Sequence, residues 1–533
     1  MVHVVRVGWR KASESAMVCR REQNVKPCTC RVRFARSELP RQMRHRHLPM
    51  GTCRRCRTVG IDHRPSTMDA QSCGTMVNSS PPLDPTMTSS TALRLMAMLP
   101  KSSRAAVVKK QRRNLSTTLS SSRGLQAVSL LPSYLADARS VTKYSPETPE
   151  GALQLGVAES QLLPDLLTEA LNVPVSLQAD AIYYQPTPGR ESLRQAMADY
   201  TKDMLKLSRD LDPEGMIVGA GCNAVLENLC FCLAEAGDAV LIPTPYYAAF
   251  EFDLVARAQL HIQSVHTSAM ELPLAEESYY PTRASLDAAY TAAVHSGHPP
   301  KILLLSHPVN PLGVCYPPHV ILDCIDWCRE NQVHLVSDEI YAGSVYDDET
   351  FVSALQLAGD ELGPYVHWVY SLSKDFALSG TRIGAAYSEN LGLRLPMQKL
   401  NDLCQLSSAT QVWAEGFLNN REWIHSYRAR NHERLRERAA ALTALLDEFH
   451  VPHLTPTAGL FCWIDLSRYL PEEGTIDERE RTLYLSLVHD YGLLLTPGRS
   501  MRHSSPGFFR CVFTAANDDE FALALERFRK FFL

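Results

Sequence analysis

Between residues 216 and 388, apolar runs recur in a regular order. Seven largely apolar runs, rich in Val, Ile and Leu, are typical of buried strands: 216–221, 239–244, 259–265, 301–307, 333–340, 366–372 and 382–388. Stretches with the helical period accompany them, such as 191–207 and 317–332. This alternation predicts an α/β fold with a mainly parallel seven-stranded sheet and helices on both faces. Functional side chains should then lie at the carboxyl ends of the strands.

The pattern changes in the last part of the chain. A long charged helix, two strands and a closing helix are predicted at 421–449, 460–466, 507–513 and 518–532. This order predicts a smaller α+β domain at 401–533, next to a large domain at 181–400. Residues 137–180 are predicted to form an N-terminal arm or a part of the small domain.

Residues 1–136 differ chemically from the rest of the 533-residue chain. They carry 24 Lys and Arg against 6 Asp and Glu, whereas the other residues carry 30 against 52. They show no sustained period that could build a core, so we expect a disordered basic extension. Aromatic residues are scarce there, so nucleic-acid binding is not expected. No apolar run in the whole sequence reaches the length of a membrane span, and no membrane partner is expected.

The extension contains two cysteine pairs and one segment without acidic residues. The C-x-C spacing of Cys28 and Cys30 is unusual for zinc, and no ordered fold is evident around this pair or around Cys53 and Cys56, so we expect no metal site. Residues 87–136 contain eight Lys and Arg and no acidic residue, a composition typical of an organelle transit peptide. The alternatives are a disordered extension, or an untranslated stretch upstream of a start at Met87. A transit peptide predicts a mitochondrial or plastid protein; otherwise the protein is expected in the cytoplasm.

Polar motifs follow four of the predicted strands. Asp338 and Tyr341 stand in VSDEIY, Asn310 follows in a Pro-rich turn, and GAGCNAVLEN joins a strand to a helix start that suits an anion. The fourth motif, YSLSKDFALSGTRIG, contains Lys374. Each motif alone is weak, but four in this order match the needs of pyridoxal phosphate (PLP).

PLP needs a particular set of groups from its protein. A lysine amine bonds to the cofactor aldehyde, a carboxylate keeps the ring nitrogen protonated, and the phosphate needs hydroxyls, a helix N-terminus and an arginine. We therefore assign Lys374 as the lysine, place Ser371 and Ser373 beside the phosphate, and expect Arg382 to bind the phosphate with its fork of donors.

From about residue 140 onward, the chain resembles the class I/II aminotransferases of PLP fold type I. Its nearest likeness is to 1-aminocyclopropane-1-carboxylate (ACC) synthases and ACC-synthase-like proteins. The likeness rests on LQLGVAESQL, PTPYYAAFEFDL, HLVSDEIYAGSVY, YSLSKDFALSGTRIG, TAGLFCWIDL and PGFFRCVF. It implies a large PLP-binding domain, a smaller C-terminal domain, and a homodimer with active sites between the subunits.

The resemblance also implies roles for individual residues. Lys374 matches the cofactor-binding lysine that moves the substrate α-proton, and Asp338 matches the partner of the ring nitrogen. Arg510 matches the arginine that binds the substrate α-carboxylate. The other matches are Asn310 and Tyr341 as donors to the ring hydroxyl oxygen, Tyr247 stacked on the ring, Cys222 and Asn223 in the phosphate turn, and Tyr184 reaching the partner's phosphate. His307 replaces the first asparagine of the family's N-P-x-N-P and is taken as a tolerated turn residue.

The reaction itself stays open at this point. Glu159 is retained where ACC synthases carry a glutamate near the substrate amino group, but their DYHG turn is replaced by YQPTPG, a form commoner in transaminases. We expect transamination between an α-amino acid and a 2-oxo acid. ACC formation from S-adenosylmethionine, or a related elimination, is the alternative. A third hypothesis, a catalytically idle homologue, is disfavoured because Lys374 and Asp338 are both present.

Overall fold

The computed structural model describes residues 121–172, 176–267, 274–346 and 351–533, all within one compact unit of the chain, Lys101–Leu533. Both cysteine pairs of the extension and residues 87–120 of the predicted transit segment lie outside these ranges, so localisation stays a prediction. Among the described helices, none is long and apolar enough to cross a membrane. The described residues also contain no group of three or more His, Cys, Asp or Glu that could hold a metal ion.

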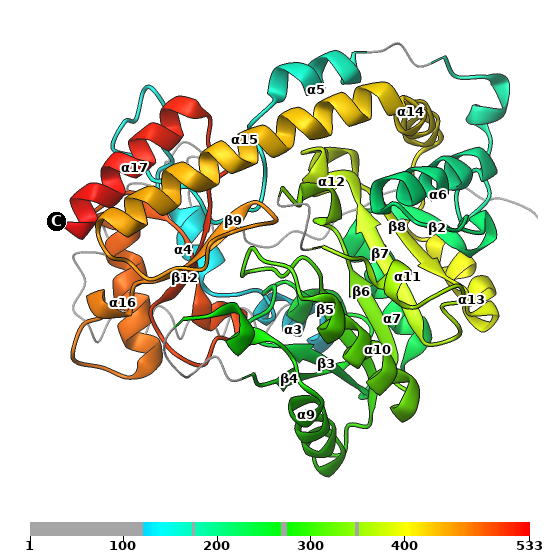
Figure 1. Ribbon diagram of the computed structural model, residues 1–533, viewed down its shortest axis with the longest axis horizontal. Coiled ribbons are helices and arrows are strands. Elements are labelled where there is room, and N and C mark those ends of the chain that lie inside the picture. The colour runs from blue at the N-terminus through cyan, green and yellow to red at the C-terminus, as the bar shows by residue number, and fades with distance from the viewer. Residues whose placement is uncertain (1–120, 173–175, 268–273, 347–350) are drawn as a thin grey trace, which may run out of the picture. The chain divides into compact units, whose positions relative to one another are not determined.

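A seven-stranded sheet lies at the centre of the larger part of this unit (Figure 1). Its strands are β2 (Met216–Ala220), β3 (Ala239–Pro243), β4 (His261–Val265), β5 (Pro300–Ser306), β6 (His334–Asp338), β7 (Val366–Ser371) and β8 (Ile383–Ser388), in the order β2-β8-β7-β6-β5-β3-β4. Strand β8 is antiparallel to both neighbours, and all other pairs are parallel. The predicted strands and the mainly parallel sheet are confirmed.

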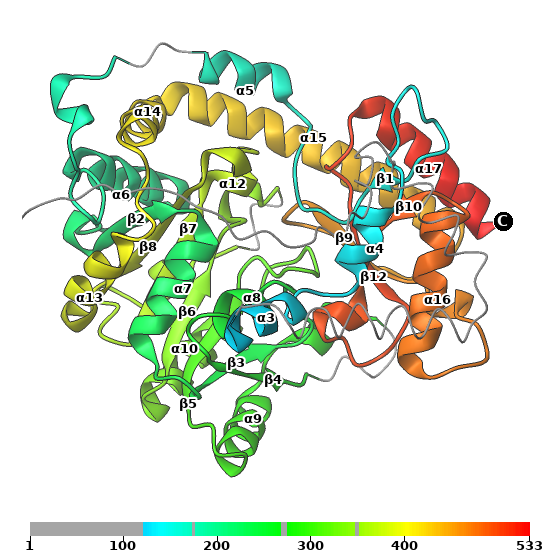
Figure 2. The ribbon, with the colours of Figure 1, turned by 180° about the vertical axis from the view of Figure 1, so that it is seen from behind.

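Helices cover both faces of this sheet, as Figures 1 and 2 show. Side chains alternate along a strand, so Leu303 and Leu305 of β5 pack on one face, and Ile302 and Leu304 on the other. The first face is covered by α6 (Glu191–Leu205), α9 (Arg283–His295) and α10 (Pro318–Asn331), and α14 (Ser408–Asn419) packs against α6. The second face is covered by α7 (Cys222–Leu233), α8 (Phe250–Val255) and α13 (Leu391–Asn401).

A second core forms around the C-terminal helices. Strand β12 (Phe508–Val512) pairs antiparallel with β9 (Phe461–Asp465) and β11 (Thr496–Pro497), and helices α15 (Arg421–Glu448), α16 (Ile476–His489) and α17 (Asp518–Phe532) pack with them. Leu153 and Leu155 of the N-terminal part join the same core, where β1 (Leu153–Gln154) pairs with β10 (Leu493–Leu494). The predicted helices and strands of this part are confirmed. The domain boundaries at 180 and 400 stay a prediction.

Local sequence explains where several of these helices begin and end. Helix α10 starts at Pro318, whose missing N–H costs nothing at a first turn, and ends at Asn331, where Gln332 caps it in the left-handed conformation. Helix α17 begins with a capping box, because Asn517 accepts from the Glu520 N–H and Glu520 accepts from the Asn517 N–H. Helix α16 repeats this device with Thr475 and Glu478.

Residues 121–136 differ from the extension we expected there. They contain α3 (Ser122–Ser129) and the start of α4 (Tyr134–Ser140). The Tyr484 hydroxyl donates to the carbonyl of Tyr134 at 3.3 Å, and Arg481 forms a two-point ion pair with Asp137. Tyr134 and Asp137 are more than 300 residues away from their partners on α16 in the sequence, so a local pattern cannot reveal these contacts. The remaining α-helices within the described residues are α5 (Pro164–Leu171), α11 (Ala354–Leu357) and α12 (Leu372–Asp375).

Candidate active site

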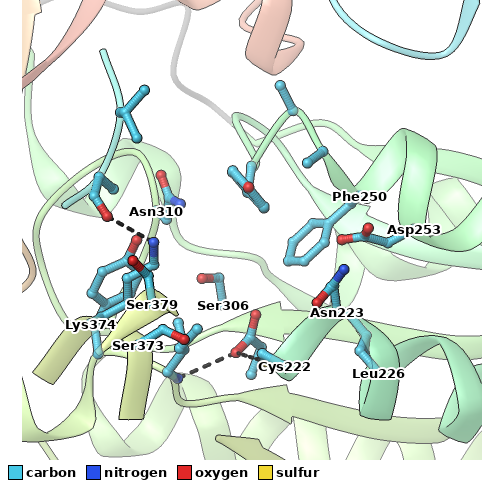
Figure 3. Close-up of a pocket in the computed structure, with 18 of the residues that line it drawn as sticks. Cys222, Asn223, Leu226, Phe250, Asp253, Ser306, Asn310, Ser373, Lys374 and Ser379 are labelled. Atoms are coloured by element: carbon cyan, nitrogen blue, oxygen red, sulfur yellow. Dashed lines mark hydrogen bonds between the residues drawn. The ribbon is translucent and has the colours of Figure 1, made fainter. Parts of the chain in front are cut away.

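A cavity of about 390 Å³ opens at the carboxyl ends of the central strands (Figure 3). Ser306 and Asp338, the last residues of β5 and β6, line it. Cys222 and Asn223 enter from the start of α7, and Ser373 and Lys374 enter from α12. The sheet topology therefore brings together motifs that lie more than 150 residues apart in the sequence.

Lys374 lies on the short helix α12, directly after β7. Its Nζ donates a hydrogen bond to the carbonyl of Ala158 at 2.7 Å (Figure 3). Burial lowers the pKa of Lys374 to about 8, assisted by the positive charges of Arg510 and Arg382, while Glu159 acts in the opposite direction. A lysine with this pKa is partly neutral near physiological pH and can act as a nucleophile or a base.

Asp338 is almost fully buried, with 6% of its surface exposed. Its Oδ1 accepts a hydrogen bond from the Ile340 N–H at 3.3 Å and lies 3.7 Å from Sγ of Cys222. Burial raises the pKa of Asp338 to about 6, and these two donors and the charge of Lys374 lower it. A carboxylate in this setting is suited to a cationic partner inside the cavity.

The start of α7 and Arg382 form one end of the cavity. Gly221 precedes the helix with φ of +96°, and a Cβ at this position would collide with the Arg382 guanidinium. Arg382 donates from Nη2 to Oδ1 of Asn223 at 2.9 Å and from Nη1 to the carbonyl of Ser379 at 3.0 Å. The open amides of the first helical turn and the guanidinium together form a site for an anion.

The two serines of the lysine motif occupy different layers. Ser373 lines the cavity, whereas Ser371 is fully buried and is not among the residues that line it. The Ser371 hydroxyl donates to the carbonyl of Ile383 at 2.7 Å and lies 2.7 Å from Oγ of Ser373. Ser371 therefore lies behind Ser373, the residue that lines the cavity, and contacts its hydroxyl.

Arg510 of β12 reaches the cavity from the C-terminal part. It is 2% exposed; Nη1 donates to Oδ1 of Asn310 at 2.8 Å, and Nη2 donates to the carbonyl of Gly156 at 2.7 Å. Its Nε is buried without a hydrogen-bond partner among the described residues. Among the described residues no carboxylate forms an ion pair with Arg510, and a buried guanidinium with a donor to spare suits a carboxylate ligand.

Two tyrosines form further walls of the cavity. Tyr247 lines it with the edge of Phe250 against its ring, at 5.4 Å between centroids. Tyr341 is buried at the cavity wall, 5.3 Å from the ring of Phe461. Burial raises the pKa of Tyr247 to about 12 and raises that of Tyr341 as well, so both hydroxyls stay protonated and can donate.

Besides Ser371, two other predicted site residues, Glu159 and Tyr184, are not among those that line the cavity. Glu159 is exposed, and its carboxylate accepts from the Ser379 hydroxyl at 3.0 Å, close enough to favour the charged form of Lys374. Tyr184 is fully exposed. The predicted role of Tyr184 lies in a partner subunit, so it stays a prediction.

Comparison with known proteins agrees with the geometry of the cavity. The family model for aminotransferase class I and II matches residues 154–528. The chain belongs to this family. It is 34% identical over 403 residues to 1-aminocyclopropane-1-carboxylate synthase 1 of Oryza sativa subsp. indica, covering 72% of this chain and 81% of the relative. It is 32% identical to 1-aminocyclopropane-1-carboxylate synthase 5 of Arabidopsis thaliana, covering 72% and 84%.

Solved aminotransferases share the fold. Aspartate aminotransferase from Thermus thermophilus with maleate superposes with a TM-score of 0.59 at 23% identity, covering 79% of this chain and 99% of that one. Aromatic aminotransferase from Pyrococcus horikoshii gives a TM-score of 0.59 at 18% identity, covering 76% and 97%. These similarities confirm the α/β aminotransferase fold.

Aminotransferases of class I and II use PLP, and the cavity of this family member fits that cofactor. Lys374, Asp338 and the anion site of Arg382 and α7 supply the three groups that PLP requires. The collision that a Cβ at Gly221 would cause shows how closely the backbone and Arg382 surround the place for a phosphate. Tyr247, Asn310 and Tyr341 also line the cavity, and their predicted contacts with the ring and its hydroxyl oxygen stay a prediction.

The sequence did not single out several residues that line the cavity. These are Leu131, Pro132, Tyr134 and Leu135, which precede the region matched by the family model, and Phe250 and Asp253 of α8. Burial, and then the charges of Asp338 and Glu227, raise the pKa of Asp253 to about 7. The only sequence signal for Asp253 was its place in PTPYYAAFEFDL, six residues after the predicted ring-stacking Tyr247.

Proposed function

We propose that this protein catalyses PLP-dependent transamination between an α-amino acid and a 2-oxo acid. The observation that carries the proposal is the convergence of Lys374, Asp338 and Arg510 on one cavity, where Asp338 and Arg510 are buried and Lys374 is half-buried with a lowered pKa. When bound, PLP withdraws electrons from the substrate Cα through its protonated ring nitrogen. Lys374, Asp338 and Asn223 with Arg382 would hold its aldehyde, ring nitrogen and phosphate ends.

Arg510 orients the amino acid. Its free Nε and its two Nη groups can grip the α-carboxylate in a fork, and the bonds to Asn310 and Gly156 hold the guanidinium in place. Binding at this site directs the Cα–H bond of the substrate, because the carboxylate and the amino group are fixed at opposite ends. Positioning of this kind supplies a large part of the rate in many enzymes.

Lys374 moves the proton. Its amine must be neutral to accept the Cα proton at Nζ, and the pKa of about 8 keeps a useful fraction neutral near pH 7. Asp338, ionised above its pKa of about 6, stabilises positive charge at the ring nitrogen over the same pH range. Transamination needs these groups and a 2-oxo acid as the second substrate. The same cavity can bind both substrates in turn.

ACC formation from S-adenosylmethionine is a second candidate. It is favoured by the ACC synthases among the relatives, at 32–34% identity, and by Glu159, whose carboxylate lies near Lys374. The replacement of the DYHG turn by Tyr184–Gly189 speaks against it. This reaction consumes no 2-oxo acid, so the two candidates differ in their products.

Parallel assays of the purified holoenzyme separate the candidates. One assay supplies S-adenosylmethionine alone and measures ACC and methylthioadenosine. The other supplies single amino acids with 2-oxoglutarate or pyruvate and measures the new amino acid. We expect turnover in the second assay. The Lys374→Ala variant is the control for both, and it should lose activity in whichever assay the wild-type protein supports.

A further inference from the structure

Asp338 receives both of its hydrogen bonds on one oxygen. The Ile340 N–H and the Cys222 thiol both contact Oδ1, at 3.3 Å and 3.7 Å. Within the part of the chain that the structure describes, no hydrogen bond involves Oδ2. One oxygen is thus held by the protein, and the other is left for a ligand of the cavity.

The thiol of Cys222 acts in this contact as a donor. Burial raises the pKa of Cys222 well above its ordinary value, and the negative charges of Asp338 and Asp253 add to this effect. The side chain therefore keeps its proton, which it can give to a carboxylate oxygen that only accepts. A thiol with this pKa is a poor nucleophile, so a reactive role for Cys222 is not supported.

We propose that Cys222 is a positioning residue: its thiol holds Oδ1 of Asp338 so that Oδ2 meets the ring nitrogen of PLP. Cys222 is the first residue of α7, so its backbone lies at the anion site while its side chain contacts Asp338. One residue thereby links the two ends of the cofactor site. The proposal rests on the PLP site and does not depend on which reaction the enzyme catalyses.

The surroundings of Asp338 explain why a neutral donor is useful there. The titratable groups that face it are Cys222, Lys374, Asp253, Tyr247 and Tyr341. Lys374 is consumed by the bond to the cofactor, and Asp253 adds a like charge. The Cys222 thiol and the Ile340 N–H favour the ionised form of Asp338 without adding a charge of their own.

Cofactor binding to the cofactor-free protein tests this role, with PLP compared against an analogue whose ring nitrogen is replaced by C–H. Cys222→Ala should weaken PLP binding about three- to tenfold, the effect of one hydrogen bond, and should leave binding of the analogue unchanged. Cys222→Ser retains a donor and should lie between the wild-type and alanine proteins. Cys232→Ala, which removes another thiol of α7, is the matched control and should change neither the Kd for PLP nor the Kd for the analogue.

Two outcomes would overturn the proposal. An equal loss for PLP and the analogue would mean that Cys222 only shapes the phosphate turn, since both molecules carry the phosphate. No loss for either would mean that the thiol contact contributes nothing. Thermal melting of each cofactor-free variant checks folding, and if the alanine variant does not fold, Cys222→Val, which is apolar and has no donor, takes its place with the same expected binding constants.

Discussion

Arg510 donates a hydrogen bond from Nη1 to Oδ1 of Asn310 at 2.8 Å, across 200 residues of sequence. This bond joins the residue expected to bind the substrate α-carboxylate to a residue expected to contact the cofactor ring. Both are buried, and Nε of Arg510 has no partner within the described residues. A substrate carboxylate would therefore meet a guanidinium that is already oriented and not yet saturated.

Arg510→Lys is expected to lower kcat/KM for every amino acid substrate by about 10- to 100-fold, because an ammonium cannot reproduce the planar fork. Steady-state kinetics with several amino acids measure this loss, and PLP affinity should stay near the wild-type value. If the loss were confined to one class of side chain, Arg510 would be reading the side chain instead of the α-carboxylate.

Asp338→Asn should retain PLP but lose most turnover, with kcat lower by about tenfold or more, because a neutral amide no longer stabilises the charged ring nitrogen. Absorbance measures the PLP content of the variant, and a steady-state assay measures its kcat. A variant with near wild-type kcat would remove Asp338 from this role.

The fold could be predicted largely from the sequence, because each strand and long helix carries its own period. Lys374, Asp338 and Arg382 could be assigned because they stand in motifs at strand ends. The wall at Leu131–Leu135 and the contact between Cys222 and Asp338 depend on packing between distant segments, which no local pattern contains. For the same reason the sequence could not tell that Ser371 lies behind Ser373.

The reaction of the cofactor-free protein with PLP should depend on pH through Lys374. Its lowered pKa of about 8 means that the neutral amine falls about tenfold for each pH unit below that value, so the rate of attachment should rise with pH and level off above about 8. Stopped-flow absorbance measures the rate, and borohydride reduction followed by peptide mapping should find the cofactor on Lys374. Label on another lysine would contradict the assignment.

The same pH profile tests whether Glu159 acts on the pKa of Lys374. Its carboxylate favours the charged form of Lys374, so Glu159→Gln should move the midpoint of the pH profile to lower pH. Glu169→Gln on α5, an exposed carboxylate outside the cavity lining, is the control and should leave the midpoint unchanged. An unchanged midpoint in both variants would show that Glu159 does not act on Lys374.

Truncation separates the N-terminal extension from the cavity wall. A protein that starts at residue 121 should bind PLP and turn over like the full chain. A protein that starts at residue 137 loses Leu131, Pro132, Tyr134 and Leu135, and its KM for amino acids should rise several-fold while PLP stays bound. Equal kinetics for the two truncated proteins would show that these side chains do not contact the substrate.

The most direct test of transamination follows the nitrogen atom of the amino acid substrate into the product. The holoenzyme is given a ¹⁵N-labelled amino acid and an unlabelled 2-oxo acid, with Lys374→Ala as control, and the products are analysed by mass spectrometry. Transamination predicts that ¹⁵N appears in the amino acid formed from the 2-oxo acid and that the control shows none. Failure to transfer ¹⁵N to any 2-oxo acid, with ACC and methylthioadenosine released one to one from S-adenosylmethionine, would contradict it.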